Sequence, residues 1–224
     1  YEYRFPLFNL SPPLIFFIGE IFRLVGFGYI DTMKMTFALS FVLSGVFMYM
    51  FSKEFFGRIG GFLSAVFYIW APYHAVDVYV RGAMNESWAL VFFPLIFLFS
   101  YKLVRSGDKD YFVWVAALAF SWFGLLTSQN LMVMIIAPFF LIWVLLLILL
   151  YKSKKLPHLL LAGIWSLGLA AFFTIPALFE NGLTHLKSQI GGDFLFSGHF
   201  VTLKQLLTSR FWGYEGSVWG TVND

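Results

Sequence analysis

Long apolar runs separated by short charged segments dominate the chain. The clearest run covers 131–150 and contains no charged residue. Its length matches the ~20 residues that an α-helix needs to cross ~30 Å of hydrocarbon. The strands of a membrane β-barrel would instead alternate apolar and polar residues, and these runs do not alternate. The pattern therefore predicts α-helices that cross a membrane.

Six apolar runs follow residue 30, and a shorter run precedes it. The predicted spanning helices cover 33–51, 59–71, 87–101, 112–126, 131–151 and 156–179. The shorter run, 14–27, carries Glu20 and Arg23 three positions apart, where they could pair on one helical face. Two charges in so short a run favour a helix at the membrane interface. The predicted fold is an all-α integral membrane protein, a polytopic bundle of about six spanning helices plus a short interfacial helix.

The same pattern predicts three parts. Residues 1–30 form a lead-in on the outer face that ends in the interfacial helix, 31–179 form the transmembrane bundle, and 180–224 begin an extracytoplasmic loop or domain. The chain begins at Tyr1 and ends within a polar stretch, which is typical of a piece of a longer protein. Whether 59–71 is long enough to cross fully stays open.

Composition excludes most soluble classes. Of 224 residues, 60% are hydrophobic and 12% are charged, against about 25% charged in an average soluble domain. A soluble enzyme, a disordered segment and a collagen-like fibre are excluded. The absence of cysteine excludes a small disulfide-stapled module. The net charge of +3 does not indicate a nucleic-acid partner, because the basic residues are scattered among apolar runs.

Basic residues gather in alternate loops. The loops at 52–58, 102–110 and 152–155 hold eight of the fifteen, namely Lys53, Arg58, Lys102, Arg105, Lys109, Lys152, Lys154 and Lys155. The two intervening loops hold only Arg81. Cytoplasmic loops are enriched in Lys and Arg, so the three basic loops are predicted to be cytoplasmic. Arg81 and the tail after 180 are then expected on the extracytoplasmic side of a plasma membrane.

One outer loop holds the densest set of reactive side chains. Within 73–86 lie Tyr73, His74, Asp77, Tyr79, Arg81 and Glu86. The planar guanidinium of Arg81 suits a phosphate or a carboxylate, because it can donate to two oxygens at once. Asp77 or Glu86 could serve as a general base. The same residues also fit a loop at the lipid headgroups in which Arg81 simply pairs with Asp77, and the residues alone leave both interpretations open.

Other candidate chemistry is weaker. His74 and Asp77 could share a metal on a helix, but no third ligand is spaced to complete the site, so no metal and no cofactor is expected. The tail carries Trp212, Tyr214 and Glu215, whose aromatic faces and carboxylate suit sugar rings. An aromatic loop lying on the membrane would use the same residues. The predicted spans carry almost no charge, which argues against an ion-coupled transporter.

The order of several motifs resembles one family of membrane proteins. The stretches that carry the likeness are 3–9 with 12–14, 71–73 with 79–83 and Glu86, 125–130, 176–180, and 212–220. They resemble the bacterial YfhO-like, or "6-pyruvoyl-tetrahydropterin synthase-related", membrane proteins, which look like members of the GT-C superfamily of glycosyltransferases. The Arg81-Gly82-Ala83 stretch with Glu86 is the most specific of them.

This resemblance implies an activity. GT-C proteins transfer a sugar from a polyprenyl-phosphate donor to an acceptor on the outer face of the membrane, so Arg81 would hold the donor phosphate. The supporting or sugar-binding residues would be His74, Asp77, Tyr79, Glu86, Glu180, Trp212, Tyr214 and Glu215. The family's acidic catalytic residue is expected in a segment before Tyr1, which leaves the catalytic residue of this chain unknown. Gln129 stands where the family pattern has His, and Gln cannot titrate near neutral pH.

The expected partners are membrane lipid, a polyprenyl-phosphate-linked sugar and membrane proteins of a glycan pathway. An alternative function is a non-catalytic protein that handles lipid-linked glycans or assists a flippase. A transporter is the weaker alternative.

Overall fold

The computed structural model describes residues 11–107 and 110–180, and these residues form helices without a strand. The elements are α2 (Leu14–Leu24), α3 (Tyr29–Ile69), α4 (Pro72–Ala75), the π-helix η1 (Val76–Val80), α5 (Met84–Arg105), α6 (Tyr111–Ser128), α7 (Asn130–Tyr151) and α8 (Leu156–Glu180). Five of them, α3 and α5 to α8, are long and apolar enough to cross a membrane. The predicted all-helical membrane architecture is confirmed to that extent. The 11-residue α2 is too short to cross.

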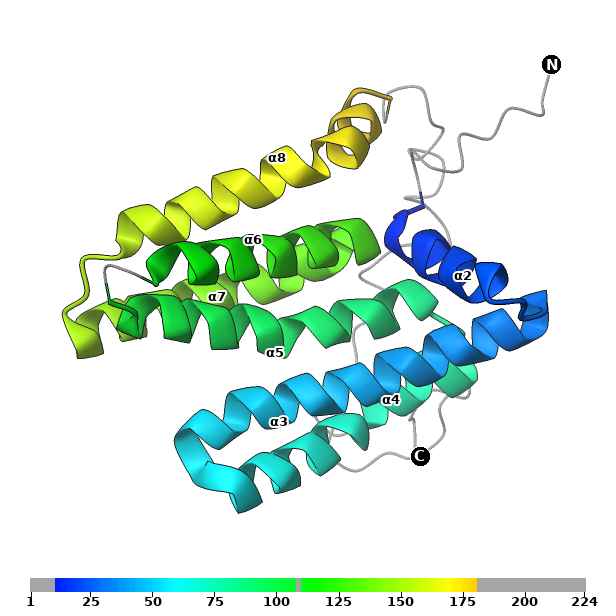
Figure 1. Ribbon diagram of the computed structural model, residues 1–224, viewed down its shortest axis with the longest axis horizontal. Helices are drawn as coiled ribbons and strands as arrows, with labels where there is room; N and C mark the ends of the chain where they lie inside the picture. Colours follow the sequence, from blue (N-terminus) through cyan, green and yellow to red (C-terminus); the bar gives the residue numbers. More distant parts are fainter. Residues whose placement is uncertain (1–10, 108–109, 181–224) are drawn as a thin grey trace, which may run out of the picture.

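The helix α3 is a hairpin of two antiparallel arms (Figure 1). Helical geometry breaks only at Gly57, with φ 68° and ψ −171°, a conformation open almost exclusively to glycine. The arms pack closely, since a Cβ added to Gly45 would lie 2.3 Å from Ile69 Cδ1. The expected loop at 52–58 is therefore wrong. The charged residues of 52–58 lie on the helix at one end of the bundle. There Lys102 Nζ forms an ion pair with Glu54 Oε2 at 2.7 Å.

The expected loop at 73–85 is also mostly helical. Pro72 occupies the first turn of α4, where its missing N–H costs nothing, and the chain continues directly into η1. Only 81–83 breaks the helical path, with Gly82 at φ 61°. Backbone groups next to apolar surroundings need internal hydrogen bonds, which a helix supplies and an open loop does not.

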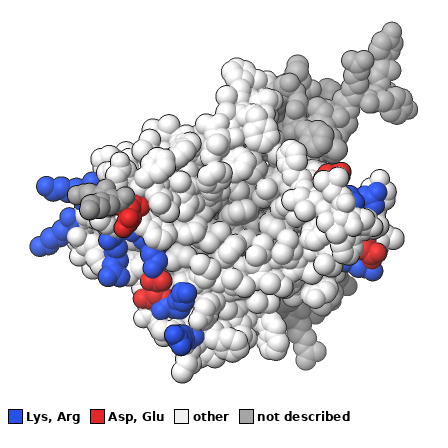
Figure 2. Space-filling view, in the orientation of Figure 1, with Lys and Arg blue, Asp and Glu red and all other residues white. Residues whose placement is uncertain are grey.

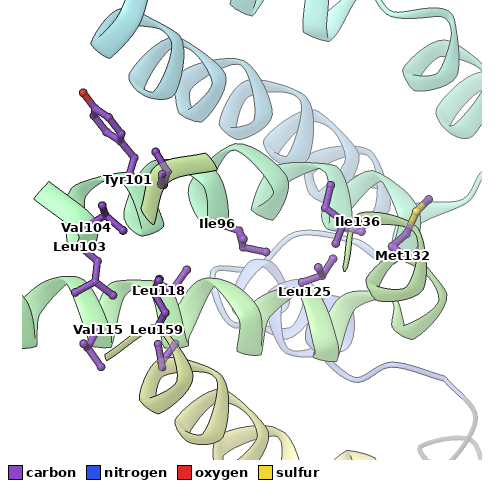
Figure 3. Close-up of a cluster of buried hydrophobic side chains, with 14 residues drawn as sticks. Ile96, Tyr101, Leu103, Val104, Val115, Leu118, Leu125, Met132, Ile136 and Leu159 are labelled. Carbon is purple, nitrogen blue, oxygen red and sulfur yellow. The ribbon is translucent and has the colours of Figure 1, made fainter. Parts of the chain in front are cut away.

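The helix α5 lies at the centre, packed against α3, α6 and α7. Its contact with α6 forms the main core (Figure 3). A Cβ added to Gly124 would lie 2.2 Å from the Phe92 ring. The largest fully buried apolar side chains of this core are Ile96, Leu103, Leu118, Leu125 and Val115. The helix α7 exposes apolar side chains along most of its length.

Small hydroxyl side chains line one face of the first arm of α3. Four of them follow at every fourth residue and are buried, namely Thr32, Thr36, Ser40 and Ser44. Small residues let helix backbones approach closely inside a membrane. Ser40 Oγ lies 2.5 Å from Ser87 Oγ, and Tyr68 donates to the carbonyl of Leu90 at 2.7 Å. Both arms of α3 are thereby tied to α5.

Charged side chains gather at the two ends of the bundle and leave its middle apolar (Figure 2). One end holds the Gly57 reversal, the end of α5 and the turn from α7 to α8, which carry Lys53, Arg58, Lys102, Arg105, Lys152, Lys154 and Lys155. The opposite end holds α2, the start of α3, η1 and the turn from α6 to α7. The basic loops and the Arg81 segment thus lie at opposite ends.

We predict that Gly57→Ala destabilises the protein, because a Cβ at this positive φ costs ~1–3 kcal/mol. Thermal unfolding of the detergent-solubilised protein, followed by tryptophan fluorescence, should show a lower midpoint. Gly163→Ala is the control, since its Cβ would meet nothing within 4 Å on the helix α8. Equal midpoints for the two variants would show that the reversal does not need glycine.

Candidate functional site

The guanidinium of Arg81 bridges two carboxylates. Arg81 Nη1 donates to Asp77 Oδ1 at 2.9 Å and to Glu86 Oε2 at 2.6 Å, while Nη2 donates to Glu86 Oε1 at 2.7 Å. Asp77 and Arg81 stand one helical turn apart, and the turn at Gly82 returns the chain so that Glu86 faces Arg81. The structure confirms the pairing of Arg81 with Asp77, which was one of the two interpretations left open by the sequence. Glu86 adds a bidentate contact to the same guanidinium.

Tyr73 completes this group of residues, which we call the Arg81 cluster. Its hydroxyl donates to Glu86 Oε2 at 2.6 Å, so that one oxygen of Glu86 accepts two hydrogen bonds. One cation is surrounded by two acids, so the cluster carries a net negative charge when both acids are ionised.

Asp77 is the most deeply buried member of the cluster. Its side chain is 0% exposed, and Oδ2 has no hydrogen-bond partner. Loss of water raises the pKa of Asp77 to about 7, the nearby charge of Glu86 adds to the rise, and Arg81 opposes it. The folded protein therefore holds the proton of Asp77 to a higher pH than an exposed aspartate does.

His74 lies beside the cluster without bonding to it. Its ring packs against Phe41 and Tyr68 at centroid distances of 5.5 and 5.1 Å, and neither ring nitrogen has a hydrogen-bond partner. Burial lowers the pKa of His74 to about 4, so the ring is neutral at physiological pH. No three His, Cys, Asp or Glu side chains come together as a metal site in the part of the chain that the structure describes.

A cavity of about 640 Å³ opens next to the cluster. Four segments enclose it: α2, the first turns of α3, the segment 82–86, and Gln129 between α6 and α7. Its charged and polar lining consists of Glu20, Arg23, Thr32, Thr36, Asn85, Glu86 and Gln129, and its apolar lining includes Ile15, Phe16, Tyr29 and Met33. Glu86 is the member of the Arg81 cluster that reaches this cavity.

The contribution of α2 was missed at the sequence level. Glu20 and Arg23 were expected to pair with each other, but no ion pair joins them in the structure. Arg23 instead donates to the carbonyl oxygen of Phe27 at 2.6 Å, and its guanidinium carbon lies 3.9 Å from the centre of the Tyr29 ring. The presence of Glu20 and Arg23 inside the apolar run 14–27 was the signal in the sequence for a role at the site. Sequence spacing alone could not place these two residues in the same cavity as Glu86.

The remaining predicted site residues are scattered or lie outside the description. Tyr79 is 82% exposed and forms no hydrogen bond with the cluster. Glu180 ends α8, and its side chain lies outside the described part of the structure. Trp212, Tyr214 and Glu215 also lie outside the described residues. Of the predicted set, the structure brings together Asp77, Arg81 and Glu86.

Searches with this chain against protein-family models, curated proteins and solved structures found no match.

We predict that Asp77 makes stability depend on pH. Its folded-state pKa lies above the ordinary value of 3.8, so the folded protein holds this proton more tightly than the unfolded chain. The stabilisation is complete below about pH 4 and is lost as pH rises to about 7. Inside that window one pH unit changes the free energy of unfolding by at most ~1.4 kcal/mol, or about 3–6 °C.

The measurement is thermal unfolding at several pH values between 5 and 8. Asp77→Asn, which resembles the protonated form in shape and charge, should flatten the pH dependence relative to wild type. Asp31→Asn removes an exposed carboxylate at the same end of the bundle and should leave that dependence unchanged. Parallel pH profiles for wild type and Asp77→Asn would contradict the assignment.

Proposed function

We propose that the full-length protein is a membrane glycosyltransferase of the GT-C type. It transfers a sugar from a polyprenyl-phosphate donor to an acceptor in the bacterial cell envelope. The observation that carries this proposal is the cavity of about 640 Å³ beside the Arg81 cluster, at one end of an apolar bundle. A volume of 300–1,000 Å³ is ordinary for a small-molecule site.

The lining of the cavity suits the three parts of a lipid-linked sugar phosphate. Apolar side chains such as Ile15 and Met33 accept the start of a lipid chain. The amides of Asn85 and Gln129 both donate and accept hydrogen bonds, as sugar hydroxyls require. The carboxylate of Glu86 accepts from hydroxyls, and the exposed Tyr29 ring offers a face for a sugar.

Arg81 has a specific place in the proposal. Three of its N–H groups already bond Asp77 and Glu86, and the side chain remains 47% exposed. It holds Glu86 at the cavity wall and does not itself line the cavity.

Orientation follows from the charges. The basic end of the bundle faces the cytoplasm, so the cavity and the Arg81 cluster face the extracytoplasmic side of the plasma membrane. Lipid-linked sugars are used on that side by GT-C proteins. In this proposal Gln129 contributes hydrogen bonds without proton transfer.

A second candidate is a non-catalytic protein that binds lipid-linked glycans or assists a flippase. One observation favours it: the guanidinium of Arg81 engages both Asp77 and Glu86, which leaves neither of these acids as a ready general base.

We predict that transfer depends on Glu86. The full-length protein is reconstituted in vesicles and given radiolabelled undecaprenyl-phosphate glucose, galactose or mannose with a cell-envelope acceptor fraction. Glu86→Gln should lower the transfer rate ~10–100-fold, because hydrogen bonds to a charged group are worth ~1.5–3 kcal/mol. Glu54→Gln, at the basic end of the bundle, should transfer at the wild-type rate.

Transfer by Glu86→Gln at the wild-type rate would contradict the assigned site. Binding of every donor without transfer by the wild type would favour the non-catalytic candidate.

A further inference from the structure

Two arginines stand at the cavity end of the bundle, and their charges are not equally available. Arg81 contacts two carboxylates at 2.9 and 2.6 Å, so its charge is already balanced. Arg23 lines the cavity and forms no ion pair with a described residue. An anion entering the cavity therefore meets at Arg23 a cation that no ion pair engages, and at Arg81 a neutral or negative cluster.

The guanidinium of Arg23 is already positioned. The turn at Gly26, with φ 104°, brings the chain back beneath α2. Phe27 then accepts one N–H of Arg23 through its carbonyl, and the ring of Tyr29 lies under the guanidinium. The other N–H groups of Arg23 have no acceptor among the described residues. A cation held in place loses little conformational freedom when a ligand arrives.

A buried hydroxyl at the same cavity lacks a partner. The Thr32 side chain is 8% exposed, its Oγ1 forms no hydrogen bond, and the residue lines the cavity. The next three buried hydroxyls along α3, in contrast, all donate to carbonyls of their own helix; they belong to Thr36, Ser40 and Ser44. Buried polar atoms are nearly always satisfied, so an orphan at a cavity wall points to a ligand that supplies its partner.

The surroundings indicate a lipid as the source of the anion. On α2 the exposed apolar residues Phe17, Ile21 and Leu24 are 62%, 62% and 80% exposed. A short helix with this exposure lies well at a membrane interface, next to the ends of lipid chains. Glu20 and Glu86 also line the cavity, so Arg23 is the cation that the described lining offers to the phosphate of such a lipid.

We propose that Arg23 and Thr32 bind the phosphate of a membrane lipid in this cavity, and that Arg81 serves mainly to hold Glu86. Arg23 donates N–H groups to the phosphate oxygens, and Thr32 Oγ1 donates to one of them. The inference rests on the proposed function for the class of ligand, a lipid phosphate. It requires neither a sugar nor transfer, so it is measured by binding alone.

The test uses full-length protein in nanodiscs and three probes: undecaprenyl phosphate, undecaprenol, which lacks the phosphate, and inorganic phosphate. Arg23→Gln should raise the dissociation constant for undecaprenyl phosphate ~10–100-fold, as expected for loss of a charge-assisted contact. Arg23→Lys should restore part of the affinity, because it keeps the charge but loses the planar geometry. Lys34→Gln removes an exposed charge from α3 at the same end, outside the cavity lining, and should bind as wild type does.

A second variant keeps the test decisive if Arg23→Gln folds poorly. Thr32→Val preserves the shape of the side chain and should lower the affinity for undecaprenyl phosphate several-fold without changing that for undecaprenol. Wild-type affinity in both variants overturns the inference, and inorganic phosphate binding as tightly as undecaprenyl phosphate overturns the lipid source. Arg23-dependent binding without any sugar transfer would uphold the inference and overturn the glycosyltransferase proposal. Sugar transfer that persists in Arg23→Gln, with unchanged binding of undecaprenyl phosphate, would overturn the inference and uphold the glycosyltransferase proposal.

Discussion

The guanidinium of Arg81 holds two acids together at one end of an apolar bundle, and the geometry of that end depends on it. A carboxylate as buried as Asp77 needs either a cation or a proton, and here it has the cation on one oxygen and a pKa near neutrality. The same cation binds both oxygens of Glu86, which ties η1 to the first turn of α5 and places Glu86 at the cavity. Removing Arg81 would leave two acids facing each other, so its first role is electrostatic support.

The remainder of the bundle follows a simple separation of charge. Charged side chains lie at the ends, while small hydroxyls and apolar side chains fill the middle (Figure 2). Because charges are costly inside hydrocarbon, this distribution suits a protein whose two ends are in water and whose middle is in lipid. The cavity lies where the charged end meets the apolar surface of α2. Its lining therefore combines a cation, amides, acids and apolar groups within one space.

The sequence predicted the elements that hydrophobic length determines. The run at 131–151 corresponds to α7 (Asn130–Tyr151), and the gap between the runs 112–126 and 131–151 reduces to Gln129 between α6 and α7. The pairing of Asp77 with Arg81 was one of the two interpretations that the residues left open, and the structure shows the pair at η1 instead of in a loop. In contrast, the two arms of α3 reverse direction at the single residue Gly57. The charged residues around it led to the prediction of a longer loop. The polar and aromatic composition of 73–85 does not distinguish a loop from α4 and η1, and the approach of α2 to Gln129 is a tertiary contact that no local pattern encodes.

Sidedness tests most directly whether the Arg81 cluster and its cavity face away from the cytoplasm. The printed chain contains no cysteine, so single substitutions can be labelled without background from it. Tyr79→Cys reports on the cluster end and Lys154→Cys on the basic end, and both positions are exposed. We predict that a membrane-impermeant maleimide labels Tyr79→Cys in intact cells and labels Lys154→Cys only after permeabilisation. Labelling of Lys154→Cys alone in intact cells would place the cavity in the cytoplasm and contradict the proposed site of lipid-linked sugar chemistry.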